Sequence, residues 1–400
     1  MRISTGKVGN QEIGDYKFLA LYAPTLYSFG GKLVNSYQPS NVGNDKLKWE
    51  TTTEKNAGID LGLLKDKVNL IIDGYIRNTS DLLVSIPVSY TTGLSSQLAN
   101  VGSVSNKGLE ATLNADIINE GKFKWSVTAN ITKNVNKVTS LGSNTEYFIP
   151  VFDQTVNGLA TLADIKPLIV KVGEPLGSFY GYQFNGVVQT GDDLSKVPTP
   201  SWTNQPVQDG DPKYKDQDGD GKITESDKVV LGSAQPKFTY GFSTNLTYEN
   251  FDLSILFQGS QGNKLYNALR QNLETTSESY NSAAIVADRW TTSNPSTSVP
   301  RAIQTSHIVL DSRYIEDASF LKLRNVTLGY TVPFKVFKLK SLKLRVFASA
   351  QNLLTITKYK GFDPEASRYG GNETSGLYQG IDLGAYPSSK SYLFGLNITF

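Results

Sequence analysis

The chain has 400 residues, and its 39 basic and 37 acidic residues leave a formal net charge of +2, which gives no electrostatic reason to expect nucleic-acid binding. Cysteine is absent, so disulfides and thiolate metal sites are excluded. The mean hydropathy is -0.28, and the apolar runs are far shorter than the ~20 residues that a helical membrane span needs.

The N-terminal ten residues contain no apolar run of the length found in a secretory signal. Two interpretations follow: a cytoplasmic chain, or a chain whose own N-terminus lies upstream of Met1. The second is favoured, because the rest of the chain has the pattern of an envelope protein.

The first predicted strands are long and are joined by short polar turns. Residues 47–64 and 68–89 flank one turn, and residues 109–117 and 123–131 flank another. In the second pair apolar and polar side chains alternate, and a period of two places successive side chains on opposite faces of a strand. The apolar set is Leu109, Ala111, Leu113, Ala115 and Ile117, followed by Phe123, Trp125, Val127, Ala129 and Ile131.

The later strands repeat this pattern. Residues 238–248 and 251–257 flank a two-residue turn, and residues 342–351 alternate in the same way. In residues 320–334 the apolar positions change phase, which predicts a β-bulge near Arg324-Asn325. The opposite faces of these strands are too polar to be a protein core, as in a barrel with a wet interior.

The last strand gives the strongest indication of the fold. Residues 392–400 alternate without exception, and one face carries Tyr392, Phe394, Leu396, Ile398 and Phe400. Nine residues match the length of a tilted membrane-spanning strand. A long apolar strand at an open edge invites aggregation in water, whereas a closed barrel in lipid has no edge. The sequence therefore predicts an all-β fold, a transmembrane antiparallel β-barrel to which residues 1–400 supply about ten strands.

The predicted connections differ in length at the two ends of the strands. Short turns lie near residues 65, 120, 250 and 335–341, whereas long connections span about 10–46, 90–103, 143–235, 260–313 and 361–388. Short periplasmic turns and long extracellular loops are the layout of outer-membrane barrels. Within the loops, residues 178–189 are predicted to form a hairpin and residues 284–292 a short helix.

Aromatic residues occur in two settings. Near strand ends they predict interfacial girdles, with the half-exposed core of a β-sandwich as the alternative; these are Phe123, Trp125, Tyr248, Phe251, Phe334, Phe337 and Phe400. In the loops they suit contact with sugars or a partner protein, with loops packed on one another as the alternative; these are Tyr16, Phe18, Tyr22, Tyr27, Phe179, Tyr180, Tyr182 and Tyr378.

One motif predicts an ion-binding site, in the extracellular loop expected over residues 190–235. The segment Asp216–Asp227, DQDGDGKITESD, matches D-x-D-x-D-G and has a further carboxylate at its twelfth position. Calcium prefers several oxygen ligands, and carboxylates at positions 1, 3 and 5 converge where the chain turns at the Gly of position 6. The alternative is a solvated turn rich in Asp and Gly. The expected ligands are Asp216, Asp218, Asp220 and Asp227, the backbone carbonyl of Lys222, and the hydroxyl of Thr224 or a water that it holds.

The chain offers few groups for catalysis. Its one histidine, His307, lies in a predicted loop without a neighbouring pair of carboxylates, and no G-x-S-x-G, H-E-x-x-H or phosphate-binding glycine loop is present. The adjacent Glu316 and Asp317 could serve a glycosidase, but they precede a strand and are predicted to be a solvated rim. We therefore predict that the protein is not an enzyme.

Several segments resemble the SusC/RagA family of TonB-dependent outer-membrane transporters. They follow the order of the family and cover nearly the whole chain. They are Lys7–Gln11 (KVGNQ), Leu47–Thr51 (LKWET), Tyr75–Leu83 (YIRNTSDLL), Asn100–Glu110 (NVGSVSNKGLE), Asp216–Asp227, Pro236–Phe242 (PKFTYGF), Ala318–Tyr330 (ASFLKLRNVTLGY) and Ala350–Leu353 (AQNL).

The resemblance implies a location and partners. It implies the C-terminal part of the β-barrel of a receptor in the outer membrane of a Gram-negative, Bacteroidetes-like bacterium, with the plug domain, TonB box and signal sequence outside these residues. A SusD-like lipoprotein would cover the barrel, and the TonB complex would energise import of oligosaccharides or peptides. The barrel-assembly machinery and outer-membrane lipid are further implied partners. The alternative from another class is a secreted or surface calcium-binding β-sandwich adhesin.

Overall fold

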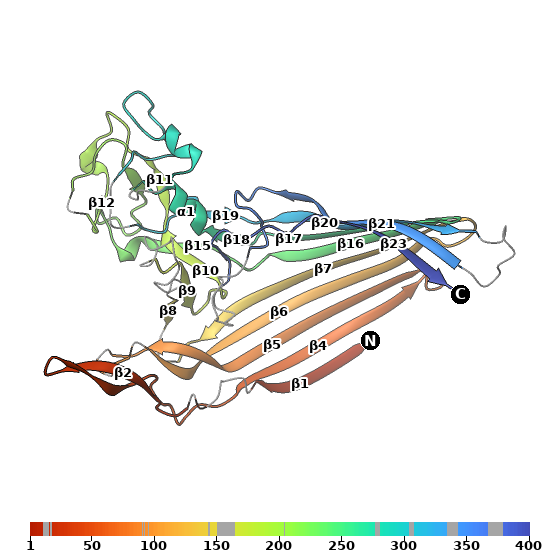
Figure 1. Cartoon of the computed structure of the whole chain (residues 1–400), viewed down its shortest axis with the longest axis horizontal. Coiled ribbons are helices and arrows are strands. Elements are labelled where there is room, and N and C mark those ends of the chain that lie inside the picture. The colour runs from red at the N-terminus through yellow and green to blue at the C-terminus, as the bar shows by residue number, and fades with distance from the viewer. Residues whose placement is uncertain are drawn as a thin grey trace.

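The computed structural model describes residues 1–10, 16, 18–89, 91, 93–94, 96–142, 145–149, 165–203, 205–276, 281–303, 308–333, 343–366 and 379–400. Ten strands form one sheet in which every neighbouring pair is antiparallel (Figure 1). In sheet order, which is also their order in the sequence, they are β1 (Arg2–Asn10), β4 (Glu50–Leu63), β5 (Val68–Pro87), β6 (Ser96–Ile118), β7 (Phe123–Ser140), β16 (Phe238–Tyr248), β17 (Phe251–Gln261), β20 (Phe320–Val332), β21 (Lys343–Thr357) and β23 (Ser391–Thr399). β1 and β23 are the two edges, so these residues form an open barrel wall, and the prediction of about ten strands is confirmed.

The register brings aromatic side chains into one row near the short turns. Phe123 pairs with Tyr248, Tyr248 with Phe251, and Phe251 with Tyr330, so four neighbouring strands present a ring at the same level of one face. A row at this place is the arrangement of an interfacial girdle. Phe334 and Phe337, which were predicted to join it, lie outside the described residues.

The bulge predicted near Arg324-Asn325 is confirmed. The pairing of β20 shifts between Leu323 and Asn325 against β21, and at the same place against β17. The extra residue is Arg324. It returns the apolar positions on both sides of the bulge to one face, because Leu323 and Val326 both pair with apolar residues of β17.

The opposite, polar face is crossed by ion pairs that span three strands. Arg345 on β21 contacts Asp252 on β17 (Nη2–Oδ2 2.5 Å) across Gly329 of β20, where an added Cβ would lie 2.5 Å from both side chains. A glycine on the middle strand is what lets the two side chains meet. Arg2 on β1 reaches Asp73 on β5 (2.9 Å) in the same way.

Long connections also lie against the polar face. Lys322 of β20 contacts Asp363 (2.7 Å), and Asn136 of β7 accepts a hydrogen bond from the backbone N–H of Leu176 (2.8 Å). The polar face is therefore the inner face of the wall, and the apolar face is the outer one.

No second sheet covers the apolar face in the described part of the chain. Leu109, Leu328 and Phe394 are 58%, 52% and 80% exposed there. A β-sandwich would bury these side chains between two sheets, so the sandwich alternative is wrong. None of the described helices is long and apolar enough to cross a bilayer.

The connections at the two ends of the wall differ as predicted. Short turns join strands at residues 64–67, 119–122 and 249–250, while the turn expected at 335–341 lies outside the described residues. The long connection predicted over 90–103 is wrong in part, because β6 already begins at Ser96. In the first part of β6 the alternation of apolar and polar residues is interrupted by Gly102 and by polar residues, so the sequence did not indicate a strand.

One long connection forms a separate hairpin of β2 (Tyr22–Phe29) and β3 (Lys32–Pro39). Gly30 and Gly31 join the strands and have φ of +57° and +77°, which a two-residue turn requires at both positions. The hairpin projects beyond the ends of the wall strands, apart from the other loops (Figure 1).

The remaining long connections fold together into what we call the loop cap, made of the described parts of residues 145–235, 262–319 and 358–390. Its elements are β8 (Glu146–Ile149), β9 (Leu168–Lys171), β10 (Ser178–Tyr182), β11 (Phe184–Val187), β12 (Thr199–Pro200), β13 (Pro212–Tyr214), β14 (Lys222–Ile223), β15 (Lys228–Ser233), β18 (Lys264–Asn267), β19 (Ile315–Asp317), β22 (Ile381–Asp382), helix α1 (Ala268–Glu274) and 3-10 helices at Leu194–Lys196, Glu225–Asp227, Ala284–Asp288 and Ser312–Tyr314.

Two predictions for the loops have different outcomes. The hairpin expected over residues 178–189 is wrong, because β10 pairs with β9 and β15 whereas β11 pairs with β13. The short helix expected over 284–292 is confirmed as the 3-10 helix Ala284–Asp288.

The largest buried core lies where the loop cap meets the wall. Val104 of β6 and Val138 of β7 contribute to it, together with cap residues that include Leu168, Phe179 and Tyr266. Loop aromatics therefore divide into two groups. Phe179 and Tyr182 are buried, as loop packing predicts, whereas Tyr22 and Tyr27 are exposed on the hairpin.

Candidate functional site

The predicted acidic loop is folded as a compact turn in the loop cap. A carboxylate oxygen of each of Asp216, Asp218 and Asp227 lies within 4.8 Å of the others. Backbone N–H groups hold Asp216 in place: those of Gly219 and Gly221 donate to its carboxylate at 2.6 and 2.8 Å. The sequence thus predicted correctly that residues at positions 1, 3 and 12 of the motif converge.

Asp227 closes the loop from its far end. It is fully buried, and it accepts hydrogen bonds from the backbone N–H groups of Gln217 and Thr224, both at 2.7 Å. Thr224 in turn caps the 3-10 helix Glu225–Asp227 through its own hydroxyl. These bonds hold the twelfth position of the motif against its second and ninth positions.

The other predicted ligands are placed differently. The carboxylate of Asp220 is outside the group of three and accepts from the backbone N–H of Lys222 (2.8 Å). Lys222 begins β14, which pairs with β12, and the Thr224 hydroxyl lies 3.4 Å from Asp227. The structure therefore brings together three of the four predicted carboxylates.

The charges in this loop shift the pKa values in opposite directions. The N–H groups of Gly221 and Gly219 stabilise the charged form of Asp216 and lower its pKa. For Asp218 the N–H of Asp220 acts in the same sense, but lost hydration and the charges of Asp220, Asp227 and Asp216 outweigh it and raise the pKa. Repulsion of this kind is what a bound cation relieves.

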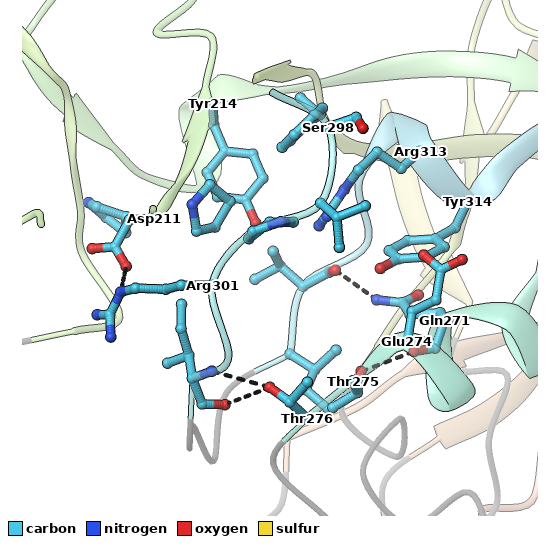
Figure 2. A pocket seen from close by; sticks show the side chains of 18 of the residues that line it. Asp211, Tyr214, Gln271, Glu274, Thr275, Thr276, Ser298, Arg301, Arg313 and Tyr314 are labelled. Atoms are coloured by element: carbon cyan, nitrogen blue, oxygen red, sulfur yellow. Dashed lines mark hydrogen bonds and ion pairs between the residues drawn. The ribbon is translucent and has the colours of Figure 1, made fainter. Parts of the chain in front are cut away.

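The loop cap also contains a pocket of about 640 Å³ (Figure 2). Three stretches of chain supply most of its lining: residues 200–214, 270–276 and 298–314. The apolar part includes Trp202, Tyr214, Val299, Ile303 and Val309. A concave, mainly apolar cavity with a few polar groups is the usual form of a ligand site.

Charged side chains of the pocket are held by ion-pair partners, some of them from distant parts of the chain. Arg301 Nε contacts Asp211 Oδ1 at 2.7 Å, and Arg270 contacts both Glu274 (2.6 Å) and Glu316 (2.8 Å). These pairs fix the guanidinium groups at the edge of the cavity, as Figure 2 shows for Asp211 and Arg301. The polar lining is thus ordered before any ligand arrives.

Two tyrosines of the lining stay uncharged. Burial raises the pKa of Tyr214, and the charge of Asp311 adds to this effect. Burial likewise raises the pKa of Tyr314, although the Arg313 guanidinium opposes it. Both rings can therefore offer an apolar face and a neutral hydroxyl to a ligand.

The acidic loop and the pocket share a wall. Tyr182, Trp202 and Tyr214 form a ring cluster with centroids 4.9–5.8 Å apart, and both Trp202 and Tyr214 also line the pocket. Asp216 follows Tyr214 by two residues, and Ile223 of the loop pairs with Pro200 of the lining. A change in the shape of the loop would therefore move residues of the pocket.

The pocket was not predicted from the sequence, because no motif in the chain indicates it. Its polar contacts join residues 90 and 46 positions apart, as in Arg301–Asp211 and Arg270–Glu316. Glu316 and Asp317 were predicted to be a solvated rim, which is wrong for Glu316: it is buried and binds Arg270, while Asp317 accepts from Ser319. His307 and Tyr378 lie outside the described residues.

Comparison with known proteins places these features in a family. The family model described as TonB dependent receptor-like, beta-barrel matches residues 18–353. TonB-dependent receptor P3 of Formosa agariphila is 35% identical over 402 residues, which cover 100% of this chain and 39% of that protein. TonB-dependent receptor SusC of Bacteroides thetaiotaomicron is 31% identical over 410 residues, which cover 100% of this chain and 37% of SusC.

A solved structure of the RagAB peptide transporter has a similar fold. Its TM-score is 0.77 at 27% sequence identity, and the match covers 100% of this chain and 40% of that one. These similarities confirm the predicted resemblance to the SusC/RagA barrel. The chain spans about 40% of the length of the relatives that it matches.

Proposed function

Because the chain belongs to the TonB-dependent receptor-like β-barrel family, we propose that it forms part of the barrel wall and extracellular loops of an outer-membrane importer. The observation that carries this proposal is the wall itself, with an exposed apolar outer face, a polar inner face and its long connections gathered at one end. Import is then a property of the whole receptor, in which TonB supplies the energy and a plug outside these residues closes the lumen. The cargo is an oligosaccharide or a peptide.

The β2–β3 hairpin is the proposed contact for a SusD-like lipoprotein. Tyr22, Phe29, Leu33 and Tyr37 are 66–73% exposed, and Lys32 is the one charged residue between Tyr22 and Pro39. The hairpin carries four exposed rings, with Tyr22 and Tyr37 on one face and Tyr27 and Phe29 on the other. Burying all four would remove on the order of 600–1,000 Å² from water, near the roughly 800 Å² that each partner gives to a standard interface. Such a surface fits a partner with an apolar, uncharged groove.

The height of the hairpin favours a protein partner over lipid. β4 descends from the hairpin to the short turn through 14 residues, which at about 3.3 Å per residue and a tilt of about 40° gives a height of roughly 35 Å. The apolar band of a barrel is about 25 Å tall. The hairpin therefore begins outside the hydrocarbon. Its base is fixed to β6, where Gln97 donates to Gly43 (2.9 Å) and Asn44 donates to Leu98 (2.9 Å).

Co-purification with the lipoprotein tests this contact in the full-length receptor. Replacing Phe29 and Leu33 by Asp should reduce the recovered lipoprotein at least ~10-fold, because charges would replace the buried core of the interface. Tyr386→Asp is the control, since Tyr386 is 94% exposed on another connection. Equal recovery in the hairpin variant and in wild type would rule out this contact.

The pocket of the loop cap is the proposed place where the cargo first contacts this part of the receptor. Ser298 lines the cavity and is exposed, so Ser298→Trp would fill it without removing a structural contact. We expect this variant to raise the half-saturating concentration for uptake while leaving the amount of folded receptor unchanged. Thr292→Trp, also exposed but outside the lining, is the control. Unchanged uptake in Ser298→Trp would show that the pocket does not contact the cargo during uptake.

Calcium in the acidic loop is a second proposal. The convergence of Asp216, Asp218 and Asp227, with Asp220, Lys222 and Thr224 beside them, supports it. Asp218→Asn should weaken calcium binding at least ~10-fold in calorimetry of the full-length receptor, because it removes one of the converging charges. Asp193→Asn, at the N-cap of the 3-10 helix Leu194–Lys196 and outside the converging group, should leave binding unchanged. Identical isotherms for wild type and Asp218→Asn would exclude the site.

A further inference from the structure

A hollow of about 430 Å³ lies on the apolar outer face. Most of its lining comes from β20, β21 and β23, which run side by side in the sheet (Figure 1). Its side-chain lining on this face is apolar apart from one tyrosine hydroxyl, and no charged residue takes part. The lining residues of this face are Phe251, Leu328, Tyr330, Val346, Ala348, Phe394 and Leu396.

The hollow arises from the sizes of side chains that the register places in one row. Ala348 of β21 pairs with Leu328 on one side and Phe394 on the other. A single methyl group therefore stands between two large side chains on strands about 10 Å apart. The next row repeats the arrangement, with Ala350 between Val326 and Tyr392. Ala348 lines the hollow, which we call the groove, and Ala350 continues the row of small side chains along β21 beyond it.

The end of the groove nearest the short turns coincides with the aromatic row. The rings of Phe251 and Tyr330 lie there with centroids 4.7 Å apart. In a barrel this row marks the periplasmic interface, where a tyrosine hydroxyl meets lipid headgroups. From Tyr330 the groove leads through Ala348 toward the middle of the apolar band.

We propose that this groove holds one acyl chain of a phospholipid from the periplasmic leaflet, with its headgroup at the level of Tyr330. The groove is continuous with the face that contacts hydrocarbon, it is one side chain wide, and it begins at the headgroup level. A second barrel would meet this convex wall along a line and could not fill so narrow a depression. The proposal rests on the proposed function only in that the outer face contacts lipid.

Native mass spectrometry of the full-length receptor with palmitoyl-oleoyl-phosphatidylethanolamine as the probe tests this site. Ala348→Phe fills the groove, and Ala129→Phe is the matched control, since Ala129 lies on the same face of β7 outside the hollow. Wild type and Ala129→Phe should retain one more phospholipid than Ala348→Phe after detergent washing, and should need at least ~10-fold less lipid to bind it. Ala348→Leu should give an intermediate result.

Three results would overturn the proposal. They are equal retention in all variants, loss of a dimer in place of a lipid in Ala348→Phe, and retention of lipid A in place of the phospholipid. Heat modifiability on gels shows whether each variant is folded, and uptake should remain normal in Ala348→Phe. Equal lipid retention in all variants with normal uptake would thus contradict the lipid proposal and leave the import proposal intact.

Discussion

In the wall, Leu328, Ala348 and Phe394 meet because strands pair residue by residue, and the period of two determines the face of each side chain. In the loop cap, Arg301 and Asp211 form an ion pair although 90 positions separate them. The residues between them show no regular alternation of apolar and polar side chains. The wall is therefore specified by a repeated pattern that tolerates exchange of one apolar residue for another. The loop cap depends on individual polar contacts, and each loss leaves a buried group without its partner.

The point where the two regions join is the most sensitive one. Lys322 of the wall has a side chain 2% exposed and contacts two cap carboxylates, Asp363 at 2.7 Å and Glu365 at 2.5 Å. Arg324, the bulge residue, also binds Glu365. Asp363 further accepts from the hydroxyl of Ser388 (2.9 Å). One buried cation thus attaches two segments of the loop cap to β20.

Lys322→Met should produce the largest effect on the loop cap. Removing one partner of a buried ion pair costs ~3–5 kcal/mol, because the other charge stays buried. Hydrogen exchange should accelerate in residues 358–366 and 381–388 while the barrel stays heat-modifiable. Lys228→Met is the control, since its partner Glu225 is 78% exposed and a surface pair contributes ~0–1 kcal/mol. Equal exchange in both variants would show that the loop cap is held by other contacts.

Phe394→Arg should produce the largest effect on the wall. The side chain is 80% exposed on the outer face, where an arginine costs ~2–4 kcal/mol at the midplane of the bilayer and less near the interface. The yield of folded, heat-modifiable receptor should fall. Asn397→Arg, three residues later on the inner face, should be tolerated better. A greater loss in Asn397→Arg would invert the assignment of the two faces.

Acid should weaken the junction between the loop cap and the wall. Although burial opposes it, the hydrogen bond from Lys322, with those from the Glu365 and Ser388 backbone and the Ser388 hydroxyl, lowers the pKa of Asp363 from 3.8 to about 2. Because the pKa of Asp363 is lower in the folded protein than in the unfolded chain, its charged form stabilises the fold at any pH above the unfolded pKa. This contribution is lost as the pH falls from about 4 to 2. It amounts to at most about 2 kcal/mol. Limited proteolysis of residues 358–366 should be constant from pH 7 to 5 and rise below pH 4. A rise above pH 5 would contradict this assignment.

The sequence was informative where a period exists. Alternation in residues 109–131, 238–257 and 392–400 predicted the strands, their faces and the open end of the sheet, and the phase change at Arg324 predicted the bulge. Spacing within one turn predicted the convergence of Asp216, Asp218 and Asp227. The pocket could not be predicted, since its lining joins three stretches whose contacts depend on how long loops fold. The hairpin of β2 and β3 was missed because both of its faces mix apolar and polar residues.

The assignment of the outer face to lipid and the inner face to the lumen can be tested directly, because these 400 residues contain no cysteine and any cysteine elsewhere in the receptor can be replaced by serine. Single cysteines introduced at positions 392–398 of the full-length receptor can each carry a nitroxide label in membranes. Collision rates with oxygen, which concentrates in lipid, should peak at Tyr392, Phe394, Leu396 and Ile398, and a water-soluble nickel chelate should show the opposite phase at Leu393, Gly395 and Asn397. Oxygen maxima at the second set, or no alternation of period two, would contradict the barrel wall on which the proposed function depends.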